Sequence, residues 1–144
     1  MDRILGLDYG EKTVGVAISD PLGITAQSLE TITRKDEISI KKTVHRIGEI
    51  IKEYNVNCIV LGFPKNMDNS EGERCNKTIL FKERLERNFK RIPVILWDER
   101  LSTIASERGL FEAGLNSKER KQVVDKIAAG FILQGYLDNI NRGE

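Results

Sequence analysis

The order of apolar and polar residues predicts three short strands at the start of the chain. An apolar run over residues 4–7 ends in Asp8, and Gly10 permits a tight reversal. A second apolar run returns over residues 14–18, and residues 24–32 alternate apolar and polar side chains. Consecutive strands joined by tight turns pair antiparallel, so we expect a hairpin extended by a third strand, with one carboxylate at its turn end.

Farther along, the spacing of apolar residues becomes that of helices alternating with buried strands. Apolar residues recur at about every third or fourth position over residues 38–54, which predicts an amphipathic helix. Residues 58–63 and 93–97 are short apolar runs, typical of strands covered on both faces in a parallel sheet. Further helices are predicted over residues 73–89, 102–112 and 116–139.

Two of these helices carry an apolar stripe that predicts their inward residues. For the helix over residues 73–89 the expected inward residues are Ile79, Leu80, Leu85 and Phe89. For the last helix the stripe consists of Val123, Val124, Ile127, Ala128, Phe131, Ile132 and Leu137. At about 100° per residue, Asp125 lies close in angle to Ile132, at the margin of this stripe.

This order of elements predicts an α/β fold with a mixed five-stranded sheet flanked by helices. The first three strands form its antiparallel part, and the last two run parallel to the first through right-handed crossovers. A chain of 144 residues is long enough to bury one substantial core, so we expect a single domain over residues 1–144.

Composition indicates a globular protein that is not held to nucleic acid by bulk charge. The sequence has 40% hydrophobic and 31% charged residues, and its 23 Lys and Arg nearly balance 22 Asp and Glu. A local basic face remains compatible with this balance. No apolar run approaches the roughly 20 residues of a membrane-spanning helix, and the start of the sequence has no signal-peptide pattern. We therefore expect a cytoplasmic protein without a membrane partner.

The cysteines and the histidine do not suggest a site. Cys58 lies in a predicted strand and Cys75 at a predicted helix start, which makes neither a disulfide framework nor a zinc site. His45, the single histidine, stands among basic residues of a predicted helix, which favours a solvated helix face over a ligand or a base.

Four acids are expected to gather at one edge of the sheet. Asp8 ends the first strand, Asp98 and Glu99 end the fifth, and Asp125 lies on the last helix. The carboxyl ends of parallel strands meet at the same edge, and the small residues 128–130 allow the last helix to approach the sheet closely. The alternative is that these are separate turn and surface acids, with Asp8 capping its own turn.

A cluster of carboxylates favours hard divalent cations. Carboxylates within a few ångströms repel one another unless a cation neutralises them, and their oxygens suit Mg²⁺ or Mn²⁺. Two such ions about 4 Å apart activate water and stabilise the leaving oxygen in phosphodiester hydrolysis. Lys12, Lys65 and Arg100 lie near the acids, where each is a candidate for holding a phosphate or for balancing local charge.

Four blocks give the sequence a family resemblance: LDYGEKTVGVA at residues 7–17, GFPKNMD at 62–68, DERLST at 98–103 and VDKIAA at 124–129. In this order, and across almost the whole chain, they resemble the signature blocks of the YqgF family, also called RuvX. The resemblance implies a ribonuclease-H-like fold and a metal-dependent nuclease domain.

The same resemblance implies roles for single residues and a substrate. It makes Asp8, Asp98 or Glu99, and Asp125 the catalytic acids that hold the metal, and Asn66 joins the three cations as a substrate-binding candidate. The implied activity is maturation of the 5′ end of precursor 16S ribosomal RNA, with ribosomal precursor particles as partners. An older assignment, by similarity to RuvC, is the resolution of Holliday junctions in branched DNA.

One feature departs from the wider resolvase fold. RuvC-type enzymes place a glutamate at the end of the fourth strand, whereas here that strand ends in residues 61–64, LGFP. A second metal ligand must then come from Asp98 or Glu99 on the fifth strand, or from Asp68 in the loop. The fifth strand should lie two strands, about 10 Å, from the first, and alternation along it decides which acid faces inward.

Three classes of function remain open from the sequence. The first is a Mg²⁺- or Mn²⁺-dependent endonuclease acting on structured RNA, with junction DNA as the alternative substrate. The second is a nucleotide-binding module of the actin/hexokinase type, which needs two such domains and a second Gly-rich loop that this sequence lacks. The third is a catalytically idle RNA-binding or ribosome assembly factor, favoured by the near-neutral charge and by the missing acid on the fourth strand.

Overall fold

The computed structural model describes residues 2–10, 13–33, 40–63, 73–98 and 117–142. Within these ranges only the backbone is described for residues 73–75, 98, 117–126 and 142. The elements in chain order are β1 (Arg3–Tyr9), β2 (Thr13–Ser19), β3 (Ala26–Thr33), α1 (Ile40–Tyr54), β4 (Val56–Phe63), α2 (Glu73–Asn88), β5 (Val94–Asp98) and α4 (Ser117–Arg142). Each overlaps the segment predicted for it, and the helix predicted over residues 102–112 lies outside the described residues.

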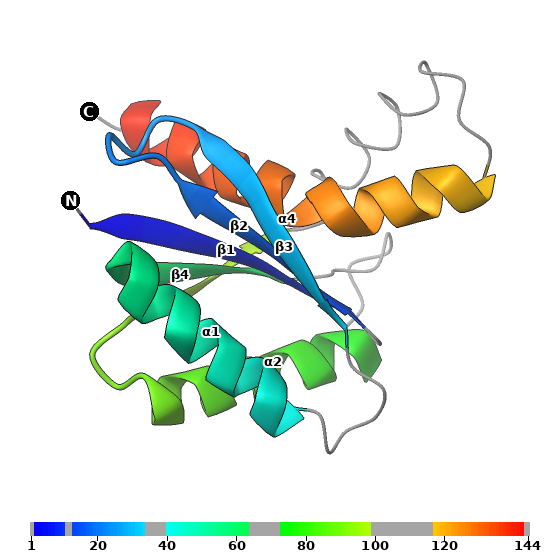
Figure 1. Ribbon diagram of the computed structural model, residues 1–144, viewed down its shortest axis with the longest axis horizontal. Coiled ribbons are helices and arrows are strands. Elements are labelled where there is room, and N and C mark those ends of the chain that lie inside the picture. Colours follow the sequence, from blue (N-terminus) through cyan, green and yellow to red (C-terminus); the bar gives the residue numbers. More distant parts are fainter. Residues whose placement is uncertain (1, 11–12, 34–39, 64–72, 99–116, 143–144) are drawn as a thin grey trace.

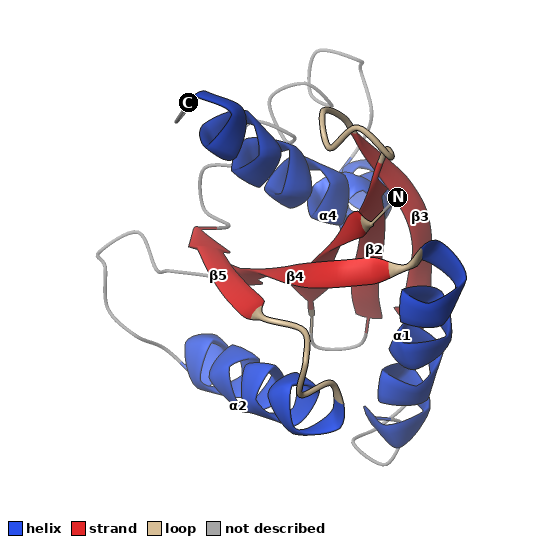
Figure 2. Ribbon diagram, turned by 90° about the vertical axis from the view of Figure 1, so that its left-hand side faces the viewer, coloured by secondary structure: helices blue, strands red, loops and turns tan. Residues whose placement is uncertain are grey.

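The five strands form one mixed sheet in the order β3-β2-β1-β4-β5. The pairs β1–β2 and β2–β3 are antiparallel, whereas β1–β4 and β4–β5 are parallel. The predicted α/β fold and its strand directions are therefore confirmed. The strand β5 lies beside β4 (Figure 2) and two strands from β1, as expected.

The sheet separates two hydrophobic clusters, because α1 and α2 cover one face and α4 covers the other (Figure 1). Cluster 1, under α1 and α2, contains the buried residues Leu5, Leu7, Tyr9, Val14, Val16, Ile18, Val44, Ile47, Ile50, Val56, Ile59, Leu61, Phe81, Leu85 and Val94. Cluster 2, under α4, contains Ala17, Val60, Ala129, Ile132, Leu133 and Leu137. Neighbouring residues of one strand fall into different clusters, as the alternation of side chains in a sheet requires.

The inward faces of α2 and α4 differ from the prediction at single positions. Leu80 is 62% exposed, whereas Phe81 is 3% exposed, because the buried face of α2 runs through Thr78, Phe81 and Leu85. Because one residue of the buried row is the polar Thr78, the apolar pattern of the sequence placed the inward face one residue away, at Ile79 and Leu80. On α4, Phe131 is 40% exposed, and Leu133, which the predicted stripe omits, is fully buried.

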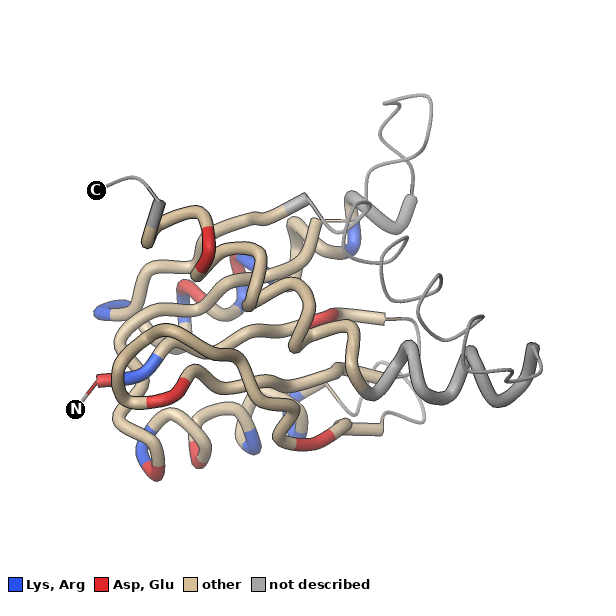
Figure 3. The backbone as a smooth tube through the Cα atoms, turned by 90° about the horizontal axis from the view of Figure 1, so that it is seen from above, with Lys and Arg blue, Asp and Glu red and all other residues tan. Residues whose placement is uncertain are grey.

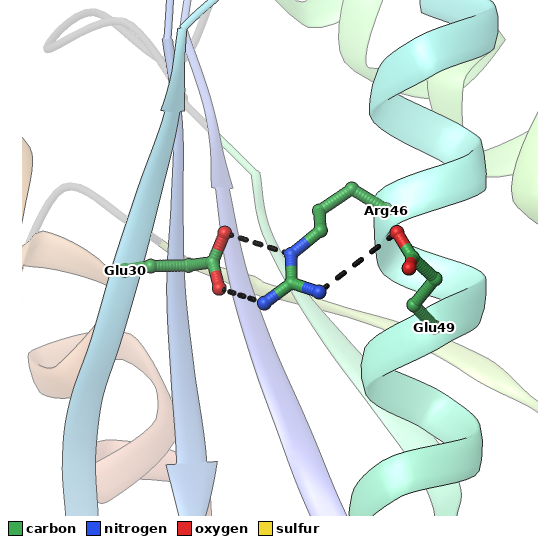
Figure 4. Close-up of polar contacts among 3 residues, drawn as sticks. All are labelled: Glu30, Arg46 and Glu49. Carbon is green, nitrogen blue, oxygen red and sulfur yellow. Dashed lines mark hydrogen bonds and ion pairs between the residues drawn. The ribbon is translucent and has the colours of Figure 1, made fainter.

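The edge strand β3 is interrupted by a bulge and tied to α1 by an ion pair. Val16 of β2 pairs with Glu30 and the next residue of β2 with Ser28, so Leu29 is the extra residue. Arg46 of α1 donates from Nε and Nη2 to the two carboxylate oxygens of Glu30, at 3.1 and 2.6 Å, and its Nη1 lies 3.8 Å from Glu49 (Figure 4). Hydrogen bonding to Glu30 raises the pKa of Arg46, so this guanidinium stays charged.

The turn between β2 and β3 is held by the carboxylate of Asp20 and by the side-chain amide of Gln134. Asp20 Oδ1 accepts hydrogen bonds from the backbone N–H groups of Ile24 and Thr25, at 2.7 and 2.9 Å. The bond from Thr25 is the main reason that the pKa of Asp20 lies below its ordinary value. From α4, Gln134 accepts from Ala26 N–H at 2.8 Å and donates to the carbonyl of Ile24 at 2.9 Å. The turn is thereby fixed to α4.

The side chains of Cys58 and His45 are described, whereas that of Cys75 is not. Cys58 is a free thiol, half buried in β4, and its burial raises its pKa. His45 is exposed on α1. Among the described residues, none of the helices combines the length and the hydropathy needed to cross a membrane.

Candidate functional site

Asp8 is a buried acid at the carboxyl end of the central strand. It is the last residue but one of β1, where it pairs with Gly15 of β2, while its neighbour Leu7 pairs with Leu61 of β4. Only 8% of Asp8 is exposed, and its Oδ1 oxygen is shielded from solvent. A carboxylate that is buried in a central strand rather than exposed in a turn needs compensating partners or a cation. This placement favours a ligand over a simple turn cap.

Asp8 belongs to the sheet face that α4 covers. Leu7 packs into cluster 1 on the opposite face. Gly6 faces α4 so closely that a Cβ at this position would lie 2.7 Å from Leu133 Cβ. Side chains two residues apart in a strand share a face, so Asp8 follows Gly6 on the α4 side of the sheet.

The helix α4 runs antiparallel to β1. Asn141, near its end, donates from Nδ2 to the carbonyl of Gly23 in the turn between β2 and β3, at 3.2 Å. The end of β2 lies beside the start of β1, because Ser19 Oγ accepts a hydrogen bond from Ile4 N–H at 2.9 Å. The first half of α4 therefore lies toward the carboxyl end of β1.

This geometry brings the backbone of Asp125 level with that of Asp8. The carbonyl oxygen of Ala129 would lie 3.1 Å from a Cβ on Gly6, so Ala129 of α4 and Gly6 of β1 lie opposite each other. From there Asp8 is two strand residues, about 7 Å, toward the carboxyl end of β1. Asp125 is four helix residues, about 6 Å, in the same direction. At about 100° per residue, position 125 also falls within the arc of α4 that packs on the sheet.

The acid at the end of β5 lies farther away. Leu61 pairs with Leu7 on one side and with Leu96 on the other. The next row across the three strands consists of Asp8, Gly62 and Trp97. Gly62 thus stands beside Asp8 on β4, which places no carboxylate there. The backbone of Asp98, paired with Phe63, is two strands from β1, a separation of about 10 Å.

Aromatic contacts that the sequence analysis missed hold both ends of this row. Tyr9, next to Asp8, stacks on Phe81 of α2 with ring centroids 4.2 Å apart. Trp97 meets Tyr136 of α4 edge-on at 5.8 Å, and a Cβ on Gly135 would lie 3.0 Å from the indole Nε1 of Trp97. The available signal was weak: Tyr9 and Trp97 directly adjoin a candidate acid and Tyr136 adjoins Gly135, whereas Phe81 has no such neighbour in the sequence.

The structure describes the predicted site residues unequally. Asp8 is described in full, and Asp98 and Asp125 by their backbone. Outside the described residues lie Lys12, Lys65, Asn66, Asp68, Glu99 and Arg100. Within the described part of the chain, no three His, Cys, Asp or Glu side chains form a metal-binding group. The backbones of Asp8 and Asp125 thus lie at a similar level along β1 and α4, and the convergence of their side chains and their roles stay predictions.

Two solved structures share this arrangement of sheet and helices. RuvC from Thermus thermophilus matches with a TM-score of 0.59 at 12% identity, covering 98% of this chain and 96% of that one. The structure titled "T. thermophilus RuvC in complex with Holliday junction substrate" matches with a TM-score of 0.57 at 14% identity, over 97% and 96% of the two chains. At such identities the likeness concerns the fold, which is a ribonuclease-H-like α/β domain.

Sequence relatives are much closer. A family model described as "RuvX: Holliday junction resolvase" matches residues 2–139. A protein from Agathobacter rectalis is 56% identical over 139 residues, 96% of each chain, and one from Acetivibrio thermocellus is 51% identical over 137 residues, 95% of this chain and 96% of the relative. Both are named "Putative pre-16S rRNA nuclease". The chain belongs to the RuvX family, and this membership places it among nucleases.

Proposed function

We propose that this chain is a divalent-metal-dependent endonuclease that cleaves phosphodiester bonds in structured RNA, foremost at the 5′ end of precursor 16S ribosomal RNA. The observation that carries the proposal is the buried Asp8 at the carboxyl end of β1, level with position 125 of α4. The names of the close relatives supply the substrate. The proposed place of action is the cytoplasm, on ribosomal precursor particles.

The donor set fits Mg²⁺ or Mn²⁺. Asp8, Asp125 and an acid of the segment 98–99 offer only carboxylate oxygens, which hard cations prefer. When bound, such a cation supplies a nucleophilic water and stabilises the leaving oxygen. The proposed task of Lys12, Lys65, Asn66 and Arg100 is to hold the phosphate backbone.

Of the two acids at the end of β5, we propose Glu99 rather than Asp98 as the metal ligand. Leu96 packs against cluster 1 and Trp97 against cluster 2, so the faces alternate up to the described end of the strand. Glu99 is two positions after Trp97 in the sequence, and this spacing is the basis of the proposal. The longer side chain of glutamate also helps to span the row that Gly62 leaves without an acid.

The test is Asp8→Asn, which keeps the shape of the side chain and removes its charge. Cleavage of precursor 16S RNA is expected to fall at least about a hundredfold, since even outer-shell changes at metal sites cost about 10–100-fold. Stabilisation of the fold by Mn²⁺, seen as a rise in Tm for the native protein, should disappear. Asp138→Asn, an exposed acid on α4, is the matched control and should change neither quantity. Full activity in Asp8→Asn would refute the proposal.

Two other functions have a specific observation in their favour. The description of the matching family model favours cleavage of four-way DNA junctions, and competition between precursor RNA and a junction for the native enzyme separates the two substrates. The acid-free position Gly62 favours a non-catalytic RNA-binding or assembly factor. That function is indicated if neither Mg²⁺ nor Mn²⁺ raises the Tm of the native protein.

A further inference from the structure

The charge of the chain is divided unequally between its two helical layers. Residues 40–54 and 76–92, which form α1, most of α2 and the segment after it, contain ten Lys or Arg against four Glu, a net charge of +6. The rest of the chain has thirteen against eighteen acids, a net charge of −5. Figure 3 marks the charged positions along the chain. The overall charge of +1 therefore conceals a basic layer on the sheet face opposite to Asp8.

Many cations of this layer are not matched by acids. Lys82 pairs with Glu86 at 3.1 Å, and Arg46 with Glu30. Within the described part of the chain, no ion pair is seen for Lys41, Lys42, Lys52, Arg84, Arg87, Lys90 and Arg91. All of these except the half-buried Arg84 are exposed. Such a surface is suited to a polyanion, because each phosphate that it neutralises releases counterions.

The layer is hollowed by a groove between α1 and α2. It has a volume of about 560 Å³, and Lys41, His45 and Lys52 of α1 face Arg84 and Asn88 of α2 across it. Glu49, the acid of this rim, lies 3.8 Å from Arg46, which also pairs with Glu30, so the rim carries three Lys or Arg against one Glu.

The floor of the groove is apolar and aromatic. It is formed by Val44, Gly48, Ile51 and Phe89. A Cβ on Gly48 would lie 3.3 Å from Cε1 of Phe89, so the absence of a side chain at Gly48 lets the edge of this ring pack closely against α1. A basic rim above an aromatic floor is the combination by which proteins bind single-stranded nucleic acid, where cations follow the backbone and bases stack on rings.

We infer that the α1–α2 layer binds a single-stranded segment of the RNA substrate, with phosphates on the rim cations and an unpaired base over Phe89. A duplex hides its bases and leaves the apolar floor unmatched, which favours a single strand. The basic surface also extends past the groove to Lys90 and Arg91, farther than a short acidic peptide in the groove would require. The inference rests on the proposed nuclease function, since it assigns a second contact to the same substrate.

The layer is connected to the acid-bearing end of the sheet. Phe81 of α2 stacks on Tyr9, next to Asp8. Phe89 follows Phe81 by eight residues, about 12 Å along the direction of α2. Because Phe81 and Tyr9 are buried, this contact shows only that the acid-bearing end of the sheet lies in the direction of the first half of α2, and an RNA strand from the groove would follow the exposed side of α2 to reach it.

The experiment measures binding of a fluorescein-labelled single-stranded RNA of about 12 nucleotides, a length within the site sizes of single-strand binders, to the full chain in EDTA. The triple variant K41Q/K52Q/R84Q is expected to bind about tenfold more weakly or worse at low salt. The slope of log affinity against log salt should fall by about 2, because each lost phosphate contact contributes about 0.7 for single strands. The matched control K82Q/E86Q removes a paired cation and acid of the same layer and should bind as the native chain does. Circular dichroism and Tm verify that both variants fold.

Equal RNA affinity and equal salt slope in the native chain and the triple variant would overturn the inference. So would a preference for duplex RNA over the single strand. Loss of binding to polyglutamate with unchanged RNA binding would overturn it in favour of an acidic protein as the partner. Because EDTA prevents metal-dependent cleavage, the outcome is independent of the Asp8→Asn test. RNA binding in EDTA that depends on the three cations, together with no cleavage of precursor 16S RNA by the native chain in a separate assay with Mn²⁺, would support this inference and refute the nuclease proposal.

Discussion

The two faces of the sheet are covered in different ways. On the α1–α2 face, large aliphatic side chains such as Ile47 and Leu61 fill a thick layer between helices and strands. On the α4 face the helix backbone approaches the sheet at Gly6, and Asp8 belongs to this closely packed side. Truncating a side chain in the thick layer leaves a cavity that its surroundings close only in part, which costs stability. At the close backbone contact an added atom must instead displace the helix. Stability should therefore depend mainly on one face and the geometry of the candidate site on the other.

The largest loss of stability is expected for Ile47→Ala on the α1–α2 face. Ile47 is fully buried in cluster 1, so its truncation leaves a cavity and costs about 2–5 kcal/mol of unfolding free energy. Urea denaturation measures this cost, and the activity per folded molecule should not change. Leu22→Ala, at a side chain that is 70% exposed, should stay within about 0.5 kcal/mol. Lost activity in folded Ile47→Ala would remove the distinction between the two faces.

A smaller loss of stability with a larger loss of function is expected for Gly6→Ala. The new Cβ would lie 2.7 Å from Leu133 Cβ and 3.1 Å from the carbonyl oxygen of Ala129, so α4 must shift. Overpacking of this kind costs about 1–3 kcal/mol. Because α4 carries Asp125, the rise of Tm with Mn²⁺ should also shrink.

Gly130→Ala is the matched control for Gly6→Ala, on α4 itself. Its Cβ would meet Ser28 Oγ at 3.3 Å, the end of a small exposed side chain that can rotate away. We expect native stability and a native response to Mn²⁺. If both variants respond to the metal as the native chain does, the close contact at Gly6 does not position the site.

The smallest expected effect is that of salt on the polar contacts that hold β3 to α1 on one face and to α4 on the other. The tie to α1 is the ion pair Arg46–Glu30, whereas Gln134 of α4 holds the strand through uncharged hydrogen bonds. Salt screens exposed charges, so about 1 M NaCl should speed amide exchange in α1 more than at Ala26. A double-mutant cycle of Arg46→Gln and Glu30→Gln should show a coupling that disappears at this salt concentration. Equal salt sensitivity of both ties would contradict the assignment.

The sequence was sufficient for the strands and their directions because its signals are local. The change of apolar period from strands to helices, the tight turns and the two buried runs fix the five strands and their directions. The row Asp8–Gly62–Trp97 follows from the strand order of the sheet with only the register added. The absence of an acid beside Asp8 on β4 was likewise visible in the sequence.

The inward faces of the helices were harder to predict because they depend on tertiary contacts. Leu80 is more hydrophobic than Thr78, yet Thr78 is buried and Leu80 exposed, since the stacking of Phe81 on Tyr9 sets the rotation of α2. The basic layer was missed for a different reason. Its cations are spread over two helices separated by β4, and only their placement on one face turns a near-neutral chain into one with a net +6 layer.

The bulge at Leu29 also affects whether a strand of another molecule can pair with the edge of this sheet. An eight-residue strand at an open sheet edge is a template for pairing with another chain, and β3 has no lysine or proline to discourage it. The extra residue breaks the regular spacing of backbone donors and acceptors along that edge, so a foreign strand cannot pair along its whole length. The bulge therefore acts against aggregation of copies of this protein through their β3 edges.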